Sequence, residues 1–380
     1  MKIIVLFIVC FQVMEILTED SIQTNFTLNF FRHCYQANPN QNTILSPIAI
    51  HTLLAMMYEV AQPDVAAELR RVLELPSDPE VIQNNIKKIK SSLNNEALRM
   101  TFRMYHSNFY TIRHEFQRII ENKFQVPVES VDFNEGQKVA DSANRWVENA
   151  TNSMIRDLFS QGDFSQDDIM MLLNAVAMNA TWALPFLSED TRKSVFHFEN
   201  GDHEVDMMFN VDFFPALAIQ GLFALELAYS QNTDLSMLII LPDHEISLSD
   251  AIDLLIEHKL YDEINSIITN QEIHMDLYMP KFSIVQKTNV KDILSTMGMD
   301  ATFLPDAFQT TRDAPSKVSC FKQNARIDVT ERGTSAAAVT EMKLSYHSLP
   351  QTIEIDRPFI FIIRKHSSKE IIFIGQYSHS

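Results

Sequence analysis

The chain has 380 residues and a formal net charge of −18, with 46% hydrophobic residues and only 7 glycines. Such an acidic chain is a poor partner for nucleic acid or for anionic membrane surfaces, because both repel negative charge. The length allows two or three domains, yet no linker, repeat or low-complexity stretch interrupts the sequence, so we expect one large domain.

Residues 1–18 have the pattern of a secretory signal peptide. Lys2 supplies the positive end, and the run from Ile3 to Val13 is apolar except for Gln12. That run is too short to span a bilayer as a helix. A retained N-terminal anchor is the alternative interpretation. We expect removal of the signal roughly between residues 15 and 20, which leaves a secreted domain over residues 19–380.

Apolar periodicity predicts a mostly helical first half and a strand-rich second half. Apolar residues recur at three- to four-residue spacing in the predicted helices, which are 46–61, 64–75, 79–94, 114–124 and 139–158. β-branched and aromatic runs predict strands over 205–208, 235–241, 273–278, 353–355, 359–364 and 371–376. Helices followed by strands indicate an α+β fold.

Two cysteines remain once the signal, which contains Cys10, is removed. Cys34 and Cys320 could form a disulfide or stay as free thiols, and their spacing does not decide between these. The histidines are scattered, and no Cys-x-x-Cys or other metal-ligand spacing occurs in the sequence. We therefore expect neither a metal nor a cofactor.

Three sequons are candidate glycosylation sites in a secreted protein, at Asn25, Asn149 and Asn179. By the family resemblance given below, Asn179 lies in a stretch similar to a central sheet strand, and a glycan needs an exposed site, so it is the weakest of the three.

Lys87, Lys88 and Lys90 form the one local concentration of positive charge that the sequence suggests on a helix. A glycosaminoglycan site needs a concentrated positive patch. In this acidic chain we interpret the three lysines as a solvated helix face.

Residues 333–339, with the sequence Gly-Thr-Ser-Ala-Ala-Ala-Val, are the most informative segment. In an extended chain Thr334, Ala336 and Ala338 point to one side, which is small and uncharged throughout. Gly333 can act as a hinge, because glycine tolerates backbone angles that other residues avoid. An Ala-rich helix is the alternative, since alanine is the best helix former.

An enzyme is not supported by the motifs present. Ser335 follows Gly333, but a nucleophile elbow needs a second glycine where Ala337 stands. His347 and Ser348 are adjacent, so in an extended chain their side chains point apart rather than forming a dyad. No glycine-rich phosphate loop occurs in the sequence.

The chain resembles the serpins, and seven motifs in the family's order carry the resemblance between about Phe26 and Tyr377. The hinge segment 331–340 is close to E-x-G-T-x-A-A-A-x-T. The other motifs are 42–50 (NTILSPIAI), 124–133 (FQVPVESVDF), Leu173-Asn174-Ala175 with Thr181-Trp182 and Pro185-Phe186, 238–242 (LIILP), 279–282 (MPKF), and 357–361 with Phe373-Ile374-Gly375. The resemblance implies a single α+β domain with a large mixed central sheet, smaller sheets, about eight or nine helices and an exposed reactive loop at about 331–351.

The resemblance also implies a function. An inhibitory serpin offers its reactive loop to a serine protease, is cleaved, and inserts the freed loop into the main sheet as a new strand while the protease remains covalently attached. The implied hinge residues are Glu331, Gly333, Thr334, Ala336, Ala337 and Ala338. The implied sheet-opening residues are Ser46, Asn174, Trp182 and Gln323.

The family's usual loop register places the cut bond between His347 and Ser348. Tyr346 is the rival specificity residue, and an aromatic there favours a chymotrypsin-like protease over a trypsin-like one. Cleavage after Lys343 would shorten the inserted strand by four residues, or roughly 13 Å. We expect such cleavage to give turnover without trapping.

Two substitutions depart from the family pattern in the sheet-opening region. Ala49 stands where serine is usual and cannot replace its hydroxyl, whereas Gln323 stands where histidine is usual and can still donate and accept. Asn179-Ala180 also replaces the usual Lys-Gly. The alternative function is that of a non-inhibitory serpin, a carrier, store or chaperone. We expect a secreted monomer whose partner is an extracellular serine protease.

Overall fold

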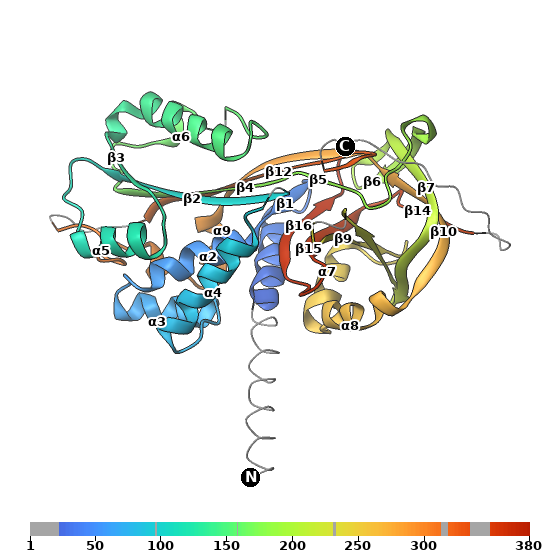
Figure 1. Ribbon diagram of the computed structural model, residues 1–380, viewed down its shortest axis with the longest axis horizontal. Coiled ribbons are helices and arrows are strands. Elements are labelled where there is room, and N and C mark those ends of the chain that lie inside the picture. Colours follow the sequence, from blue (N-terminus) through green and yellow to red (C-terminus); the bar gives the residue numbers. More distant parts are fainter. Residues whose placement is uncertain (1–22, 96, 158, 231–232, 313–317, 335–349) are drawn as a thin grey trace, which may run out of the picture.

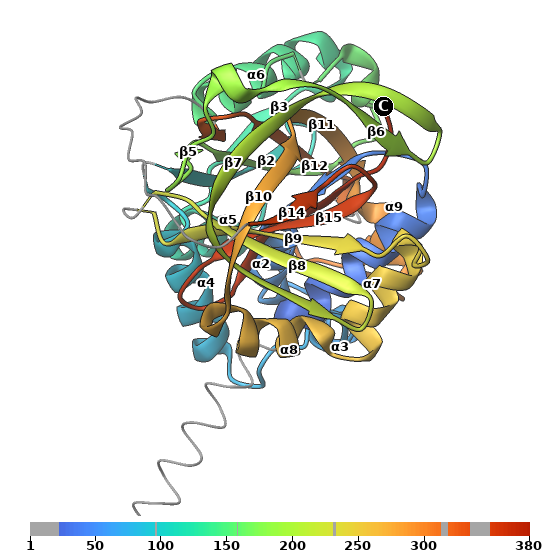
Figure 2. The ribbon, with the colours of Figure 1, turned by 90° about the vertical axis from the view of Figure 1, so that its right-hand side faces the viewer.

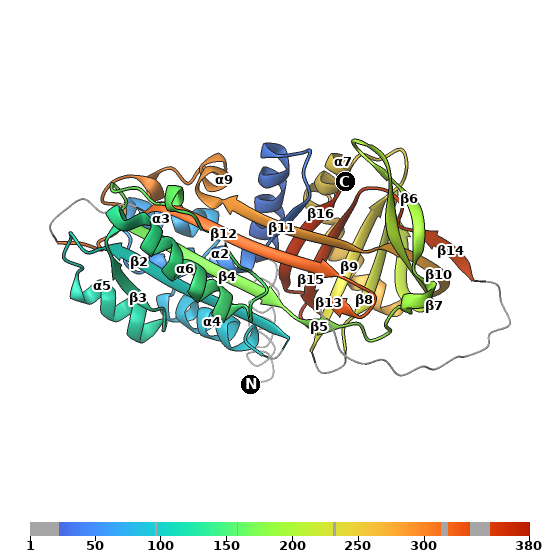
Figure 3. The ribbon, with the colours of Figure 1, turned by 90° about the horizontal axis from the view of Figure 1, so that it is seen from above.

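The computed structural model describes residues 23–95, 97–157, 159–230, 233–312, 318–334 and 350–380. Figures 1 and 3 show an elongated molecule, with a five-stranded sheet and most helices at one end and a nine-stranded sheet at the other. No helix in these ranges is both long and apolar enough to cross a membrane.

Three helices of the first half begin at prolines. These are α2 (Pro47–Tyr58), α3 (Pro63–Val72) and α4 (Pro79–Ser92). Proline suits the first helical turn, because the amide proton it lacks would have no partner there. The other α-helices are α5 (His114–Arg118), α6 (Gly136–Ala150), α7 (Leu248–Glu257), α8 (Leu260–Ile267) and α9 (Val290–Thr296), and residues 23–37 are also helical.

The five-stranded sheet is mixed and lies between two layers of helix. Its order is β11 (Phe282–Asn289), β12 (Val318–Val329), β4 (Met170–Met178), β2 (Leu98–Ser107) and β3 (Val128–Val131). All nine residues of β4 are buried, because α2 contributes to the core on one face and α6 to the core on the other. Figure 1 shows α6 and α2 on opposite sides of this sheet. Burial on both faces explains why β4 is an unbroken apolar run except for Asn174.

The nine-stranded sheet is strongly curved (Figure 2). Its buried middle is β9 (Leu235–Pro242), β15 (Phe359–Lys365) and β16 (Ile371–Tyr377). The order is β1 (Thr43–Leu45), β16, β15, β9, β8 (Leu222–Ala228), β7 (Gly201–Ile219), β10 (Glu272–Pro280) and β14 (Gln351–Glu354), with β6 (Arg192–Phe198) also paired to β7. A short separate pair joins β5 (Ala180–Thr181) to β13 (Gly333–Thr334).

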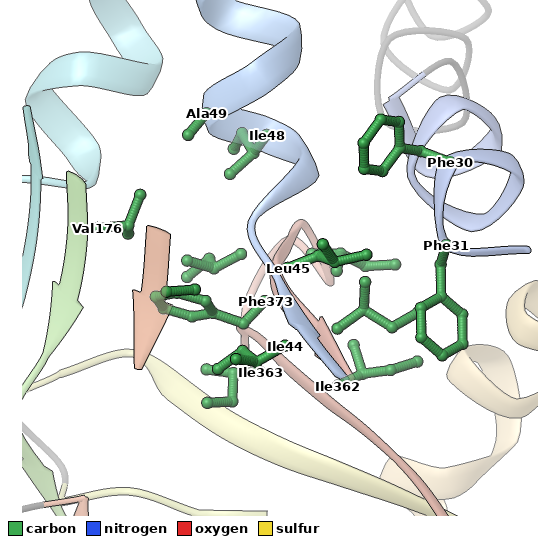
Figure 4. Close-up of a cluster of buried hydrophobic side chains, with 14 of the residues drawn as sticks. Phe30, Phe31, Ile44, Leu45, Ile48, Ala49, Val176, Ile362, Ile363 and Phe373 are labelled. Atoms are coloured by element: carbon green, nitrogen blue, oxygen red, sulfur yellow. The ribbon is translucent and has the colours of Figure 1, made fainter. Parts of the chain in front are cut away.

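The start of α2 connects the two sheets. Figure 4 shows Ile48 and Ala49 of α2 beside Val176 of the five-stranded sheet, with Leu45 and Phe373 of the nine-stranded sheet beneath them. All five side chains are buried. A movement of β4 therefore changes the packing of α2 as well, because close-packed cores transmit displacement.

The predicted helices and strands are confirmed, as are a mostly helical first half and a strand-rich second half, but each half has exceptions. The strand β2, which sequence reasoning missed, lies in the first half, where Leu98, Met100 and Phe102 alternate with polar residues as a half-buried strand requires. Three of the helices, α7, α8 and α9, lie in the second half. The helix predicted over 139–158 ends at Ala150, and the chain turns through positive φ at Asn152 and Ser153.

Candidate functional site

The candidate site is where β4 and β12 lie side by side. These strands pair in parallel, with Met170–Val176 against Val318–Ala325. Parallel neighbours cannot be joined by a tight turn. A chain that reversed direction after β12 would lie antiparallel to both strands if it entered between them.

The chain does reverse after β12, at the hinge that the sequence predicts. Thr330 and Gly333 form an antiparallel bridge, with hydrogen bonds of 3.0 and 3.1 Å between their backbones. Gly333 has a φ of +127°, and a Cβ on it would lie 2.4 Å from the carbonyl oxygen of Ala180. Only glycine fits, because the backbone angle is strained for other residues and the space for a side chain is already filled.

Thr334 is held by a pair of stacked rings. Its hydroxyl lies 3.1 Å from the hydroxyl of Tyr229, whose ring stacks on Trp182 with centroids 4.4 Å apart. Trp182 also donates from Nε1 to the carbonyl of Thr330 and from its backbone amide to the carbonyl of Arg332, both at 2.9 Å. Trp182 therefore fixes the reversal itself, beyond the sheet-opening role that the resemblance implies.

Glu331 anchors the hinge by charge. Its Oε1 accepts from Nζ of Lys281 and from the hydroxyl of Thr191, each at 2.9 Å, and its carbonyl accepts from the amide of Phe186 at 2.8 Å. Burial opposes ionisation, but hydrogen bonds from Lys281, from its own amide and from Thr191 outweigh it and hold the pKa of Glu331 below its ordinary value. The anchor is therefore ionised at neutral pH.

Gln323 binds Ser46, the residue before α2, at the middle of the β4–β12 pair. Its Oε1 accepts from the amide of Ser46 and its Nε2 donates to the carbonyl of Ser46, both at 2.8 Å. The Ser46 hydroxyl donates to the carbonyl of Ile372 at 2.8 Å. The prediction that Gln323 both donates and accepts is confirmed, and its partner is backbone. Ala49 needs no hydrogen-bond partner, and it packs as a buried side chain near Val176 (Figure 4).

On the opposite face of the sheet, an acidic residue holds both β11 and β12. Asp163, in the short helical turn Gln161–Asp163 after α6, accepts from Lys287 of β11 and Lys322 of β12, both at 2.6 Å. Burial opposes ionisation of Asp163, but the two lysines keep its pKa well below the ordinary range. Any separation of β4 from β12 would therefore change the contacts that Asp163 makes with Lys287 and Lys322.

Sequence reasoning missed Lys281, Thr191, Tyr229 and Asp163. Lys281 lies inside the motif 279–282, but nothing in that motif indicates a contact with the hinge. The other three come from segments whose pattern gives no sign of proximity to residue 331 or residue 322. Their role depends on long-range folding, which a single sequence does not display.

Several predicted features lie outside the described residues. They are the residues at and near the reactive bond (Lys343, Tyr346, His347 and Ser348), the hinge residues Ala336, Ala337 and Ala338, and the signal peptide 1–18 with Cys10. Of the cysteines, Cys34 is a buried free thiol whose pKa burial raises to about 12, so it is not a reactive nucleophile. The side chain of Cys320 is not among those described.

All three sequons are exposed at their asparagines. Asn25 lies on the helix over 23–37, and Asn149 lies near the end of α6. The expectation that Asn179 sits inside a strand is wrong, because β4 ends at Met178 and Asn179 is exposed beyond it. Glycosylation at each of them stays a prediction.

The lysines of α4 do not form a common patch. Lys87 and Lys88 are exposed, whereas Lys90 is half-buried and donates to the carbonyl of Phe124. Burial lowers the pKa of Lys90. The third lysine therefore holds the end of the helical segment before Phe124 rather than adding to an exposed surface for an anionic ligand.

Comparison with known proteins agrees with this geometry. Residues 21–380 match the model of the serpin (serine protease inhibitor) family. An uncharacterized serpin-like protein of Thermococcus kodakarensis is 31% identical over 93% of this chain and 83% of its own length. Plasminogen activator inhibitor 1 of Neovison vison is 27% identical over 93% and 91%. The crystal structure of Serpin48 of the insect Tenebrio molitor has a TM-score of 0.81 at 27% identity, covering 95% of this chain and 98% of that one. The chain belongs to the serpin family.

Proposed function

We propose that this chain is a secreted serine protease inhibitor that works as a suicide substrate. The observation that carries the proposal is the docked hinge. Gly333 and Thr334 already form a short strand at the end of β4, next to the parallel pair that an inserting strand would enter. The hinge is held by a few hydrogen bonds and one ion pair, so cleavage of the loop could release it into the sheet.

The register of insertion follows from the bridge between Thr330 and Gly333. Continued without a bulge, this antiparallel register sets the small residues Thr334, Ala336 and Ala338 opposite Val329, Ile327 and Ala325. Those three residues of β12 are buried in the core shared with α2. An inserted strand must therefore present small, uncharged side chains on this face, which is the pattern that the hinge sequence has.

The same register brings Thr340 opposite Gln323 and beside Asn174, because Gln323 and Asn174 are partners across the closed pair. It brings Glu341 opposite Lys322. Each loop residue would meet a complementary group. The hydroxyl of Thr340 would lie beside side-chain amides, and the carboxylate of Glu341 would lie beside the ammonium of Lys322. The loop sequence is thus suited to the interior of the sheet well beyond the hinge.

The chemistry is that of an interrupted peptide hydrolysis. The hydroxyl of the protease's serine attacks the carbonyl carbon of His347, and its proton passes through the protease's histidine to the departing amine of Ser348. The His347–Ser348 bond breaks, and an ester joins His347 to the protease. Insertion of the strand ending at His347 then carries the protease along the sheet before water can cleave the ester.

The length of the inserted strand matches the sheet. A strand from Thr334 to His347 would span roughly 46 Å, slightly more than β12 with its 12 residues. A cut after Tyr346 changes this little. A cut after Lys343 removes roughly 13 Å and would leave the protease short of the far end. The proposed partner is therefore a chymotrypsin-like extracellular protease, bound by a monomer without cofactor or glycosaminoglycan.

The second candidate function is a non-inhibitory serpin, and heat separates the two. The intact inhibitor is metastable, so cleavage in the loop should raise its melting temperature sharply as the loop inserts. Limited cleavage by chymotrypsin followed by calorimetry supports the proposal if the transition moves up by tens of degrees. A cleaved protein that melts within a few degrees of the intact one contradicts insertion and supports the carrier or storage role.

A further inference from the structure

Three large apolar side chains are exposed in one place near the hinge. Leu184 is 45% exposed, Val211 46% and Phe213 37%. Val211 and Phe213 are two residues apart on β7, so they face the same side. The amide of Asn210 donates to the carbonyl of Leu184 at 3.2 Å, and Leu184 and Phe213 line the same small pocket. We name Leu184, Val211 and Phe213 the flank patch.

The flank patch continues across the next strand as an aromatic surface. Phe213 stacks on His274 of β10 with centroids 4.8 Å apart, and Val211 lies opposite Asp276. The other large apolar side chains exposed in the described ranges are separate from one another: Phe109 and Leu304 lie in loops, Val285 on β11, and Val195 on β6 opposite Glu204. Scattered single residues need no explanation, but a contiguous group indicates an interaction surface.

The flank patch lies between the two ends of the reactive loop. On one side, Leu184 sits between Trp182 and Phe186, whose amides bind the hinge carbonyls of Arg332 and Glu331. On the other side, β10 pairs with the edge strand β14, which begins at Gln351, just after the reactive loop. Figures 2 and 3 show β7, β10 and β14 adjacent at this end of the molecule. A globular partner bound to the loop would lie over the patch.

The charged residues beside the flank patch indicate what kind of protein surface would bind it. The strands β7, β10 and β14 contain no lysine or arginine, and the acidic residues on the same face as Val211 and Phe213 are Glu272 and Asp276 of β10 and Glu354 of β14. The nearest basic residues on a paired strand are Arg192 and Lys193 of β6, and Lys193 is paired with Asp206 at 2.9 Å. An apolar patch beside acidic residues complements a surface that is apolar at its centre and basic at its rim.

We propose that the flank patch is an accessory docking site for the target protease, which must carry basic residues beside its active-site cleft. This inference rests on the proposed function. An extended loop alone presents little area, whereas stable protein complexes bury about 800 Å² on each partner. The flank patch supplies further contact next to the loop and selects among proteases that could all cleave it.

The experiment measures the second-order rate of complex formation with bovine chymotrypsin, a basic protease. The test variant is Val211→Ser with Phe213→Ser, and the matched control is Val285→Ser, which removes a 60% exposed valine from β11. We expect the test variant to associate about five- to twentyfold more slowly, with an unchanged stoichiometry of inhibition, and the control to stay within about twofold.

A charge variant adds an independent readout. Asp276→Lys should slow association at about 50 mM salt and lose most of that effect at about 300 mM, because screening removes long-range repulsion from a basic partner. Equal association rates for the wild type, the double variant and Asp276→Lys at both salt concentrations would overturn the flank patch proposal.

A chymotrypsin with its catalytic serine changed to alanine separates the two proposals. It binds the intact loop without cleaving it, so its affinity reports docking even if no covalent trapping occurs. If the wild type traps active chymotrypsin, and the variants bind the inactive protease and react with the active one as well as the wild type does, only the docking proposal fails. If the wild type never traps a protease, the proposed function fails, and weaker binding of the inactive protease to the double variant would still support docking.

Discussion

Gln323 and Asn174 are partners across the β4–β12 pair, yet only Gln323 has its side chain satisfied. Both side-chain atoms of Asn174 are buried without a hydrogen-bond partner among the described residues. A buried unpaired amide costs about 1–3 kcal/mol. In the proposed register Thr340 arrives beside Asn174, so this cost would be removed when the loop inserts. Asn174 therefore destabilises the closed sheet relative to the inserted one.

Replacing Asn174 should stabilise the intact protein. We expect Asn174→Leu, which keeps the branched shape of the side chain and removes its polar atoms, to raise the free energy of unfolding by about 1–2 kcal/mol. The gain in melting temperature on loop cleavage should become smaller, because the inserted form loses the contact with Thr340. Urea unfolding of intact and cleaved protein measures both. If the intact variant is less stable than the intact wild type, the side chain of Asn174 has hydrogen-bond partners in solution.

The small face of the hinge gives a prediction with an internal control. Ala336→Arg would bring a charge opposite Ile327 in the buried core face, so we expect slow insertion and conversion of the inhibitor into a substrate. Ser335→Arg adds the same side chain one residue earlier, opposite the partly exposed Asp328 in the proposed register, and should still trap. Denaturing gels of each variant with chymotrypsin distinguish trapping from turnover. An Ala336→Arg protein that still forms a covalent complex would refute the assignment of this face.

The Glu331 anchor predicts a dependence on pH. Its pKa is depressed in the folded protein, so its contribution is present above the unfolded value of about 4.3 and is lost as the pH falls through the folded value. Lys281→Met removes the ion pair while burial remains, which should raise that pKa and shift the loss to higher pH. We expect spontaneous loss of inhibitory activity to accelerate in acid, and to do so at higher pH in the variant. Superimposable pH profiles would exclude Glu331 as the titrating group.

A buried ion cluster in the nine-stranded sheet should dominate acid stability. Oε1 of Glu226 lies 3.1 Å from Arg364, and it accepts from the hydroxyl of Ser236 at 2.6 Å. Burial opposes ionisation, but Arg364 and then Ser236 lower the pKa of Glu226 to about 2. Its stabilisation is therefore complete above its unfolded pKa of about 4.3 and is lost as the pH falls towards 2.

We expect Glu226→Gln to cost about 3–5 kcal/mol at pH 7, because it leaves Arg364 buried and unpaired. The difference from the wild type should shrink below about pH 4. The control is Lys365→Met, which removes a looser pair with Glu370 at 3.5 Å and should cost about 1 kcal/mol or less. Urea unfolding between about pH 2 and pH 7 tests both. A constant difference across that range would show that Glu226 does not titrate as described.

The sequence predicted the elements with strong local signals. Helices that start at Pro47, Pro63 and Pro79 and the apolar runs of β9, β15 and β16 were found from periodicity alone. The strand β2 was missed although Leu98, Met100 and Phe102 alternate with polar residues, because its surroundings are helical.

The hinge and sheet-opening residues were found by resemblance, but the groups that hold them were not. Lys281, Thr191 and Tyr229 contact residues 50 to 140 positions away in the chain. Such contacts depend on which strands become neighbours, and one sequence does not encode that in any local period. The exposure of Asn179 was missed for a related reason, because a strand's end is set by its partners as much as by its own residues.

The most direct test of trapping is a denaturing gel with mass analysis of the released peptide. The mature protein is incubated with chymotrypsin, trypsin and elastase. We predict a covalent complex with chymotrypsin that survives denaturation, together with a C-terminal peptide beginning at Ser348, or at His347 if Tyr346 is the specificity residue. Clean cleavage within 335–349 by all three proteases, with no complex and no gain in heat stability, would contradict the proposed mechanism and favour the non-inhibitory function.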